Sequence, residues 1–109
     1  MQAVLHIEVL SAAPLDAAAA FHGKHLKKAR ETFTKADELA LVFHPADHTH
    51  RAWRLAAIQE LAREAAPGRV NGIVGDDSQA IAEMLAYLAS APGVTGQLFA
   101  VDGKFAGNG

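Results

Sequence analysis

The chain has 109 residues, 50% of them hydrophobic, no cysteine and a formal net charge of −2. This length allows one domain, and the balanced charge excludes a nucleic-acid backbone as the expected partner. No apolar run is long enough to span a bilayer, and the N-terminus lacks a signal-peptide pattern. Together with the absence of cysteine, these features predict a cytoplasmic protein without disulfides.

The first half of the chain alternates apolar runs with a helical stretch. Residues 4–10 (VLHIEVL) predict a strand, because β-branched residues favour extended backbone. After a turn at Pro14, apolar residues at helical spacing predict a helix over residues 15 to about 35. Residues 39–43 (LALVF) predict a second strand, which a proline ends.

The second half of the chain repeats this alternation. A helix is predicted over residues 51 to about 66, where a Pro-Gly pair stops it. A third strand is predicted over residues 69–74. The turn Asp76-Asp77-Ser78 is expected to cap another helix, which Pro92-Gly93 ends. A fourth strand is predicted over residues 96–101.

This order of elements predicts an α/β fold with a four-stranded, mostly parallel sheet and three crossover helices, in two or three layers. If the strands pair in chain order, crossovers of the same hand place every helix on one face of the sheet. The other face would then need a partner or a folded-back segment to cover it. One domain is expected over residues 1–103, with a loose tail over residues 104–109.

Several short motifs in the last third of the chain carry a resemblance to a known family. A helix ending in Glu64-Ala65-Ala66-Pro67 precedes Val70-Asn71-Gly72-Ile73, and Leu88-Ala89-Ser90 precedes Thr95-Gly96-Gln97 and Val101-Asp102-Gly103. In this order and spacing, the motifs resemble the C-terminal part of the short-chain dehydrogenase/reductase family. The resemblance implies a Rossmann-type fold, of which this chain matches the second half, so that a half-Rossmann domain is expected.

The chain departs from the family at the cofactor loop and at the catalytic pair. The family has a glycine-rich dinucleotide loop after its first strand, whereas residues 11–15 of this chain read SAAPL, without glycine. The family's catalytic tyrosine and lysine fall near Asp47 and Arg51, and arginine cannot act as a proton shuttle. No cofactor is therefore predicted, and a non-catalytic function is favoured.

The expected partners follow from the sheet edge and from the resemblance. The strand over residues 4–10 is expected to have an uncovered outer edge, and such edges tend to pair with another strand. The resemblance also implies docking through the two helices over residues 15–35 and 51–66, through which the family's subunits often associate. A homodimer or a protein-interaction subunit is therefore predicted, with no nucleic-acid or membrane partner.

Two segments at predicted strand ends are candidates for chemistry, because ligands bind at this end of an α/β sheet. His44, His48 and His50 are candidate metal ligands, since imidazole binds zinc, nickel or copper. His44, Asp47 and His48 are candidates for acid–base catalysis. A solvated polar loop is the alternative for all of them.

The second segment is the turn Gly75-Asp76-Asp77-Ser78, a candidate ligand pocket for which helix capping is the alternative. Two further functions therefore stay open beside the non-catalytic one. The first is a small-ligand or metal-dependent enzyme with its site at these loops, and the second is a residual NAD(P)-binding module near residues 74–77.

Overall fold

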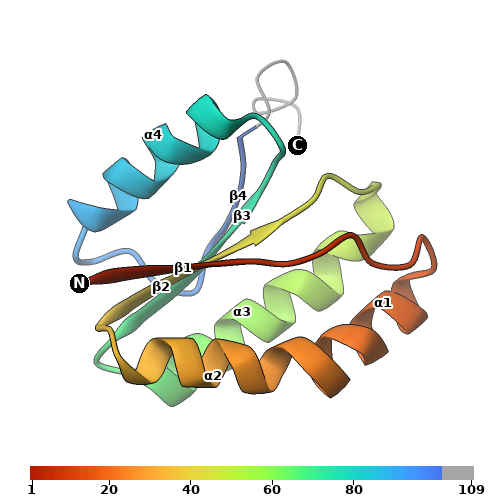
Figure 1. Ribbon diagram of the computed structural model, residues 1–109, viewed down its shortest axis with the longest axis horizontal. Coiled ribbons are helices and arrows are strands. Elements are labelled where there is room, and N and C mark those ends of the chain that lie inside the picture. The colour runs from red at the N-terminus through yellow and green to blue at the C-terminus, as the bar shows by residue number, and fades with distance from the viewer. Residues whose placement is uncertain (102–109) are drawn as a thin grey trace.

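The computed structural model describes residues 1–101 (Figure 1). Its strands are β1 (Gln2–His6), β2 (Glu38–Phe43), β3 (Arg69–Val74) and β4 (Leu98–Ala100). Its helices are α1 (Pro14–Ala20), α2 (Leu26–Thr34), α3 (Arg51–Ala65) and α4 (Ser78–Ala89). The π-helical turn η1 (Phe21–His25) joins α1 to α2, and the 3-10 turn η2 (His48–His50) leads into α3. The predicted tail over residues 104–109 lies outside the described residues.

The four strands form one sheet in the order β1-β2-β3-β4, and each neighbouring pair is parallel. All six residues of β2 are buried, because this strand has a neighbour on each side and helices over both faces. The predicted α/β fold with a parallel four-stranded sheet is confirmed. None of the helices in residues 1–101 is both long and apolar enough to cross a membrane.

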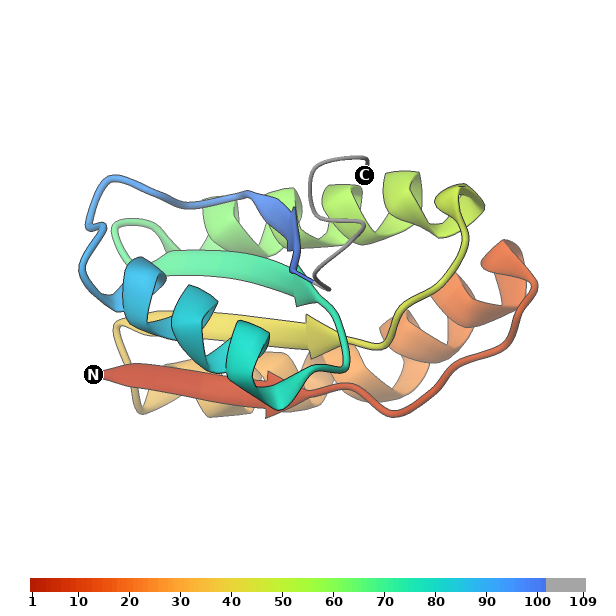
Figure 2. The same ribbon diagram turned by 90° about the horizontal axis from the view of Figure 1, so that it is seen from above.

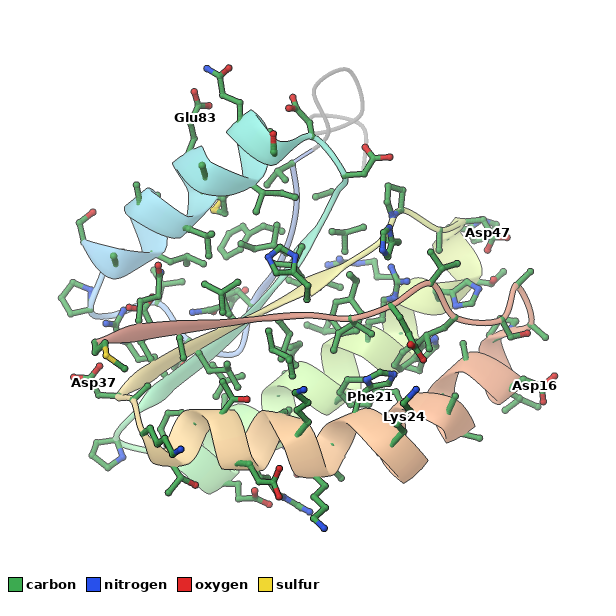
Figure 3. All side chains as sticks on the ribbon, viewed as in Figure 1. Asp16, Phe21, Lys24, Asp37, Asp47 and Glu83 are labelled. Atoms are coloured by element: carbon green, nitrogen blue, oxygen red, sulfur yellow. The ribbon has the colours of Figure 1, made fainter. Side chains whose placement is uncertain are left out.

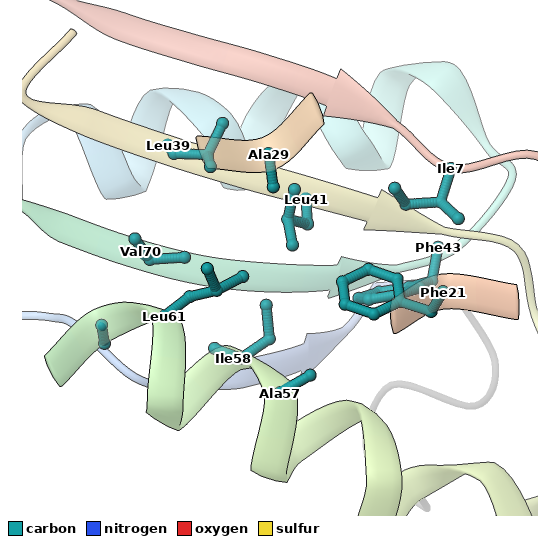
Figure 4. Close-up of a cluster of buried hydrophobic side chains, with 11 residues drawn as sticks. Ile7, Phe21, Ala29, Leu39, Leu41, Phe43, Ala57, Ile58, Leu61 and Val70 are labelled. Atoms are coloured by element: carbon teal, nitrogen blue, oxygen red, sulfur yellow. The ribbon is translucent and has the colours of Figure 1, made fainter. Parts of the chain in front are cut away.

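Helices cover both faces of the sheet, which gives three layers. In Figure 2, α4 lies in front of the sheet, and α1, α2 and α3 lie behind it. Leu39, Leu41 and Phe43 of β2 face the larger helical layer, where they pack with Phe21 and Ile58 (Figure 4). Ala40 and Val42 of β2 point to the other face of the sheet, where they pack with Ile81 and Leu88 of α4.

The position of α4 corrects the expectation that all helices share one face. The four strands are parallel, and each new strand is added at the same edge of the sheet. Because α4 lies on the opposite face from the earlier helices, the β3–α4–β4 crossover has the opposite hand to the crossovers from β1 to β2 and from β2 to β3. Burial explains this arrangement, because the apolar stripe of α4 covers β-strand side chains that would otherwise face water. Residues 90–97 give the chain the length to return to the sheet edge.

The two outer strands are shorter than predicted. β1 ends at His6, and Val9, which was expected within the strand, is 72% exposed because the chain has already left the sheet. β4 begins at Leu98, because Gly96 takes a φ of +73°, a left-handed conformation that interrupts extended backbone. The predicted helix over residues 15–35 is one helical run from Pro14 to Thr34 that contains the π-helical turn.

Asn71 joins β3 to the segment that precedes β4. Its side chain is fully buried, its Nδ2 donates to the Val94 carbonyl over 3.0 Å, and its Oδ1 accepts from the Gln97 N–H over 3.1 Å. The backbone N–H of Val70 adds a bond of 3.1 Å to the Thr95 hydroxyl. These polar contacts fix the start of β4 against β3.

Candidate functional site

A pocket of about 390 Å³ lies at the carboxyl ends of β1, β2 and β3. We call it the strand-end pocket. It opens beside α4, whose side chains Ile81, Ala82 and Leu85 form one of its walls. The neighbouring strand β1 is the edge strand of the sheet. The other lining residues of the pocket are His6, Ile7, Val42, His44, Gly75, Asp76 and Ser78.

Parallel strand ends and one backbone bond bring the polar residues of this pocket together. His6 is the last residue of β1, and His44 directly follows β2. The Gly75 N–H donates to the Phe43 carbonyl over 3.0 Å, which holds the turn after β3 against the end of β2. Ser78 begins α4. Two imidazoles, a carboxylate and a hydroxyl therefore line one pocket with an apolar wall.

The structure brings four of the predicted ligand-site residues together: His44, Gly75, Asp76 and Ser78. Asp77 has a structural role, because its side chain accepts the Gln79 N–H over 3.1 Å and so caps α4. In this turn, Asp77 therefore caps the helix, whereas its neighbours Gly75, Asp76 and Ser78 line the pocket. Ligand binding by these residues stays a prediction.

The segment between β2 and α3 contains Asp47, whose carboxylate caps η2. It accepts the Thr49 N–H over 3.0 Å and also the Thr49 hydroxyl. These hydrogen bonds hold the pKa of the Asp47 carboxyl below its usual range. Figure 3 shows this side chain at the outer end of the molecule, away from the sheet. Asp47 and His48 are exposed, and neither lines the strand-end pocket.

His50 is buried and uses both ring nitrogens for hydrogen bonds. Its Nδ1 accepts from the Trp53 indole N–H over 3.1 Å, so its Nε2 carries the proton and donates to the Ala12 carbonyl over 3.0 Å. The structure does not bring His44, His48 and His50 together. Within residues 1–101, no group of three or more histidine, aspartate or glutamate residues is placed to hold a metal ion.

His6 is the polar residue of the pocket lining that the sequence did not predict. The signal that could have found it is the rule that the carboxyl ends of parallel strands meet at one edge of the sheet. Ending the first strand at Leu10 put His6 in its middle, whereas ending it at His6 puts the imidazole beside His44 in the pocket lining.

A second hollow surface runs between α2 and α3, and its smaller pocket reaches Leu39 of β2 and Val70 of β3. It contains two pockets of about 370 and 260 Å³, which share Arg30, Leu61 and Glu64. We call this surface the helix groove. Arg30 bonds Glu64 through its Nε at 2.8 Å and its Nη2 at 2.9 Å, and this contact lowers the pKa of the Glu64 carboxyl. Apolar residues line the larger pocket beside this pair: Leu26, Trp53, Ala56, Ala57 and Leu61.

The parallel sheet, the helices on both faces and the pocket at the strand ends define an α/β protein of the Rossmann-like class. Residues 5–101 match the model of the SDR-like family, described as short chain dehydrogenase-like protein. The chain therefore belongs to this family, and the resemblance drawn from the sequence motifs is confirmed. No curated protein and no solved structure matches the chain significantly.

Proposed function

We propose that this chain is a non-catalytic member of the short chain dehydrogenase-like family that acts as a homodimer. The non-catalytic part rests on the two positions that correspond to the family's tyrosine and lysine. Asp47 caps η2 with a lowered pKa, so its carboxyl stays ionised at neutral pH and has no proton to donate. Arg51 is exposed, and an arginine side chain cannot replace a lysine that exchanges protons.

The helix groove is the observation that carries the dimer. The apolar lining of its larger pocket lies on α2 and α3, in the two helical segments through which subunits of the resembled family often dock. Ala56 is exposed on α3 within this lining, and its small side chain lets a helix from a second copy approach closely. The carboxylates at the groove have partners within the chain, because Glu64 pairs with Arg30 and Glu60 pairs with Arg63. They therefore need no partner from a second copy.

The substitution Ala56→Glu should dissociate the dimer. A carboxylate at the centre of the helix–helix contact would be buried without a partner, which weakens association by at least about 100-fold. Sedimentation equilibrium of the wild type should give twice the chain mass of 11.5 kDa, and of the variant the mass of one chain.

The matched control is Ala86→Glu, an exposed alanine on α4 at the opposite side of the sheet, which should leave the dimer intact. A wild type that is monomeric at micromolar concentration would refute the homodimer. A dimer that withstands Ala56→Glu would refute the helix groove as its interface.

A second candidate function is the binding of a small polar ligand in the strand-end pocket. The observation that favours it is the meeting of His6, His44, Asp76 and Ser78 around one pocket with an apolar wall. Imidazole and hydroxyl groups can both donate and accept hydrogen bonds, so these groups suit recognition of a polar molecule.

The substitution Ala82→Trp should abolish such binding, because the new ring fills the pocket from its α4 wall. Ligand-observed NMR with a library of small polar molecules measures the effect, and Ala86→Trp on the same helix is the control. NAD and NADP should give no signal at millimolar concentration, because Asp76 repels phosphate groups and the glycine-rich loop is missing. Hits that both variants retain would refute this pocket as the site.

A further inference from the structure

Arg54 is a buried cation on the inner side of α3. The residue is only 6% exposed and lies in the first turns of the helix, on the side that faces the sheet. Its guanidinium carbon lies 4.8 Å from the centre of the Phe43 ring and 5.7 Å from that of the Trp53 ring. Because Phe43 is the last residue of β2, the charge sits at the carboxyl end of that strand.

This guanidinium has no counter-charge in the part of the chain that the structure describes. None of the ion pairs within residues 1–101 includes Arg54, and its Nε is fully buried without a hydrogen-bond acceptor. Burial lowers the pKa of this guanidinium, because an apolar surrounding disfavours its charged form. Aromatic faces stabilise a cation in part, but they supply neither a negative charge nor an acceptor for its N–H groups.

The place of Arg54 in the fold is one where α/β proteins bind ligands. β2 and β3 are neighbours, with Phe43 paired to Val74 at their carboxyl ends. The chain leaves β2 for α3 on one face of the sheet and leaves β3 for α4 on the other face (Figure 2). Ligands of open α/β sheets bind outside the carboxyl ends of the strands, at points where neighbouring connections leave toward opposite faces.

We propose that Arg54 anchors a binding site for an oxyanion, the carboxylate or phosphoryl group of a small ligand, at the carboxyl ends of β2 and β3. The planar guanidinium presents its donors in a fork that matches the oxygens of either group. The Phe43 and Trp53 rings contact the guanidinium and hold this fork in place before a ligand arrives. This site is separate from the strand-end pocket, whose lining does not include Arg54 or Phe43.

Thermal unfolding in sodium phosphate and in sodium acetate tests the proposal, with sodium chloride holding the ionic strength constant. At ten times its dissociation constant, the bound anion should raise the Tm of the wild type by about 5 °C or more. The variant Arg54→Met should lose this rise. Arg51→Met, which removes an exposed guanidinium from the same helix, should retain it.

The two salts distinguish the ligand classes. A rise in phosphate alone assigns the site to phosphoryl groups, and a rise in acetate alone assigns it to carboxylates. Phosphate also stabilises proteins by exclusion from their surface, so the decisive quantity is the difference in Tm rise between the wild type and Arg54→Met. Equal rises in both proteins for both salts would overturn the proposal.

A second measurement on the wild type makes the test independent of how well Arg54→Met folds. The Nε–Hε signal of Arg54 in ¹H–¹⁵N NMR spectra should shift saturably as the effective anion is added. Arg51 serves as the internal reference, and its signal should move only with ionic strength. An Arg54 signal that follows the Arg51 signal would overturn the proposal.

Discussion

Replacing Phe43 with alanine should lower the free energy of unfolding by about 4 kcal/mol. The side chain is 1% exposed, and its ring centre lies 5.9 Å from that of Phe21 and 6.0 Å from that of Trp53. Its removal leaves a cavity in the larger core cluster and takes away the ring under the Arg54 guanidinium. Urea denaturation followed by circular dichroism gives the free energy directly.

The matched control for this prediction is Phe99→Ala. Phe99 is only half-buried and makes its ring contact with the exposed Tyr87, so its loss should be about half as large. Equal losses at the two positions would contradict the central place that the structure gives to Phe43.

The substitution Asn71→Asp should cost about 3 kcal/mol of stability at pH 7. Asn71 is fully buried, and the exchange replaces the Nδ2 donor with an oxygen that faces the Val94 carbonyl. Burial and this repulsion raise the folded-state pKa of the new carboxyl above its unfolded value of about 3.9. The native state therefore binds the proton more tightly, so the loss is smallest below that pH and grows as the pH rises.

Denaturation of the Asn71→Asp protein at pH 4 and pH 7 checks the sign of this effect, with the wild type measured at both. Asn71→Leu is the control, because it removes the same two hydrogen bonds without adding a charge. Its deficit relative to the wild type should be the same at both pH values. A deficit for Asn71→Asp that does not grow with pH would show that the carboxyl reaches solvent.

The alternation of apolar runs and helical stretches was enough to predict the elements, because each strand and helix has a local pattern and local stop signals. It was also enough for the parallel sheet, since helices separate the strands. It could not predict the face that α4 covers. That choice depends on which side of β2 and β3 would otherwise stay uncovered, and this is a property of the assembled sheet.

The candidate site could also be predicted only in part, because local patterns mark some of its residues and the assembled fold determines the others. The turn after β3 and His44 could be placed because they follow predicted strands directly. His50 could not, because its burial depends on Trp53 and on the Ala12 carbonyl, which is distant along the chain. Arg54 was missed because arginine is almost never fully buried without a partner, so the sequence of α3 does not mark this residue as a buried one. In the structure, Arg54 is buried on that helix and Leu55 is only half-buried.

The placement of α4 opposite the other helices has a consequence for an assembly of two copies. In a dimer joined through the helix groove, α1, α2 and α3 of each copy lie toward the centre, and α4 lies on the outside. The strand-end pocket opens beside α4, so the two pockets point away from each other, with two sheets and the joined helical layers between them. Ligands would then occupy them as independent sites, with a Hill coefficient of about 1.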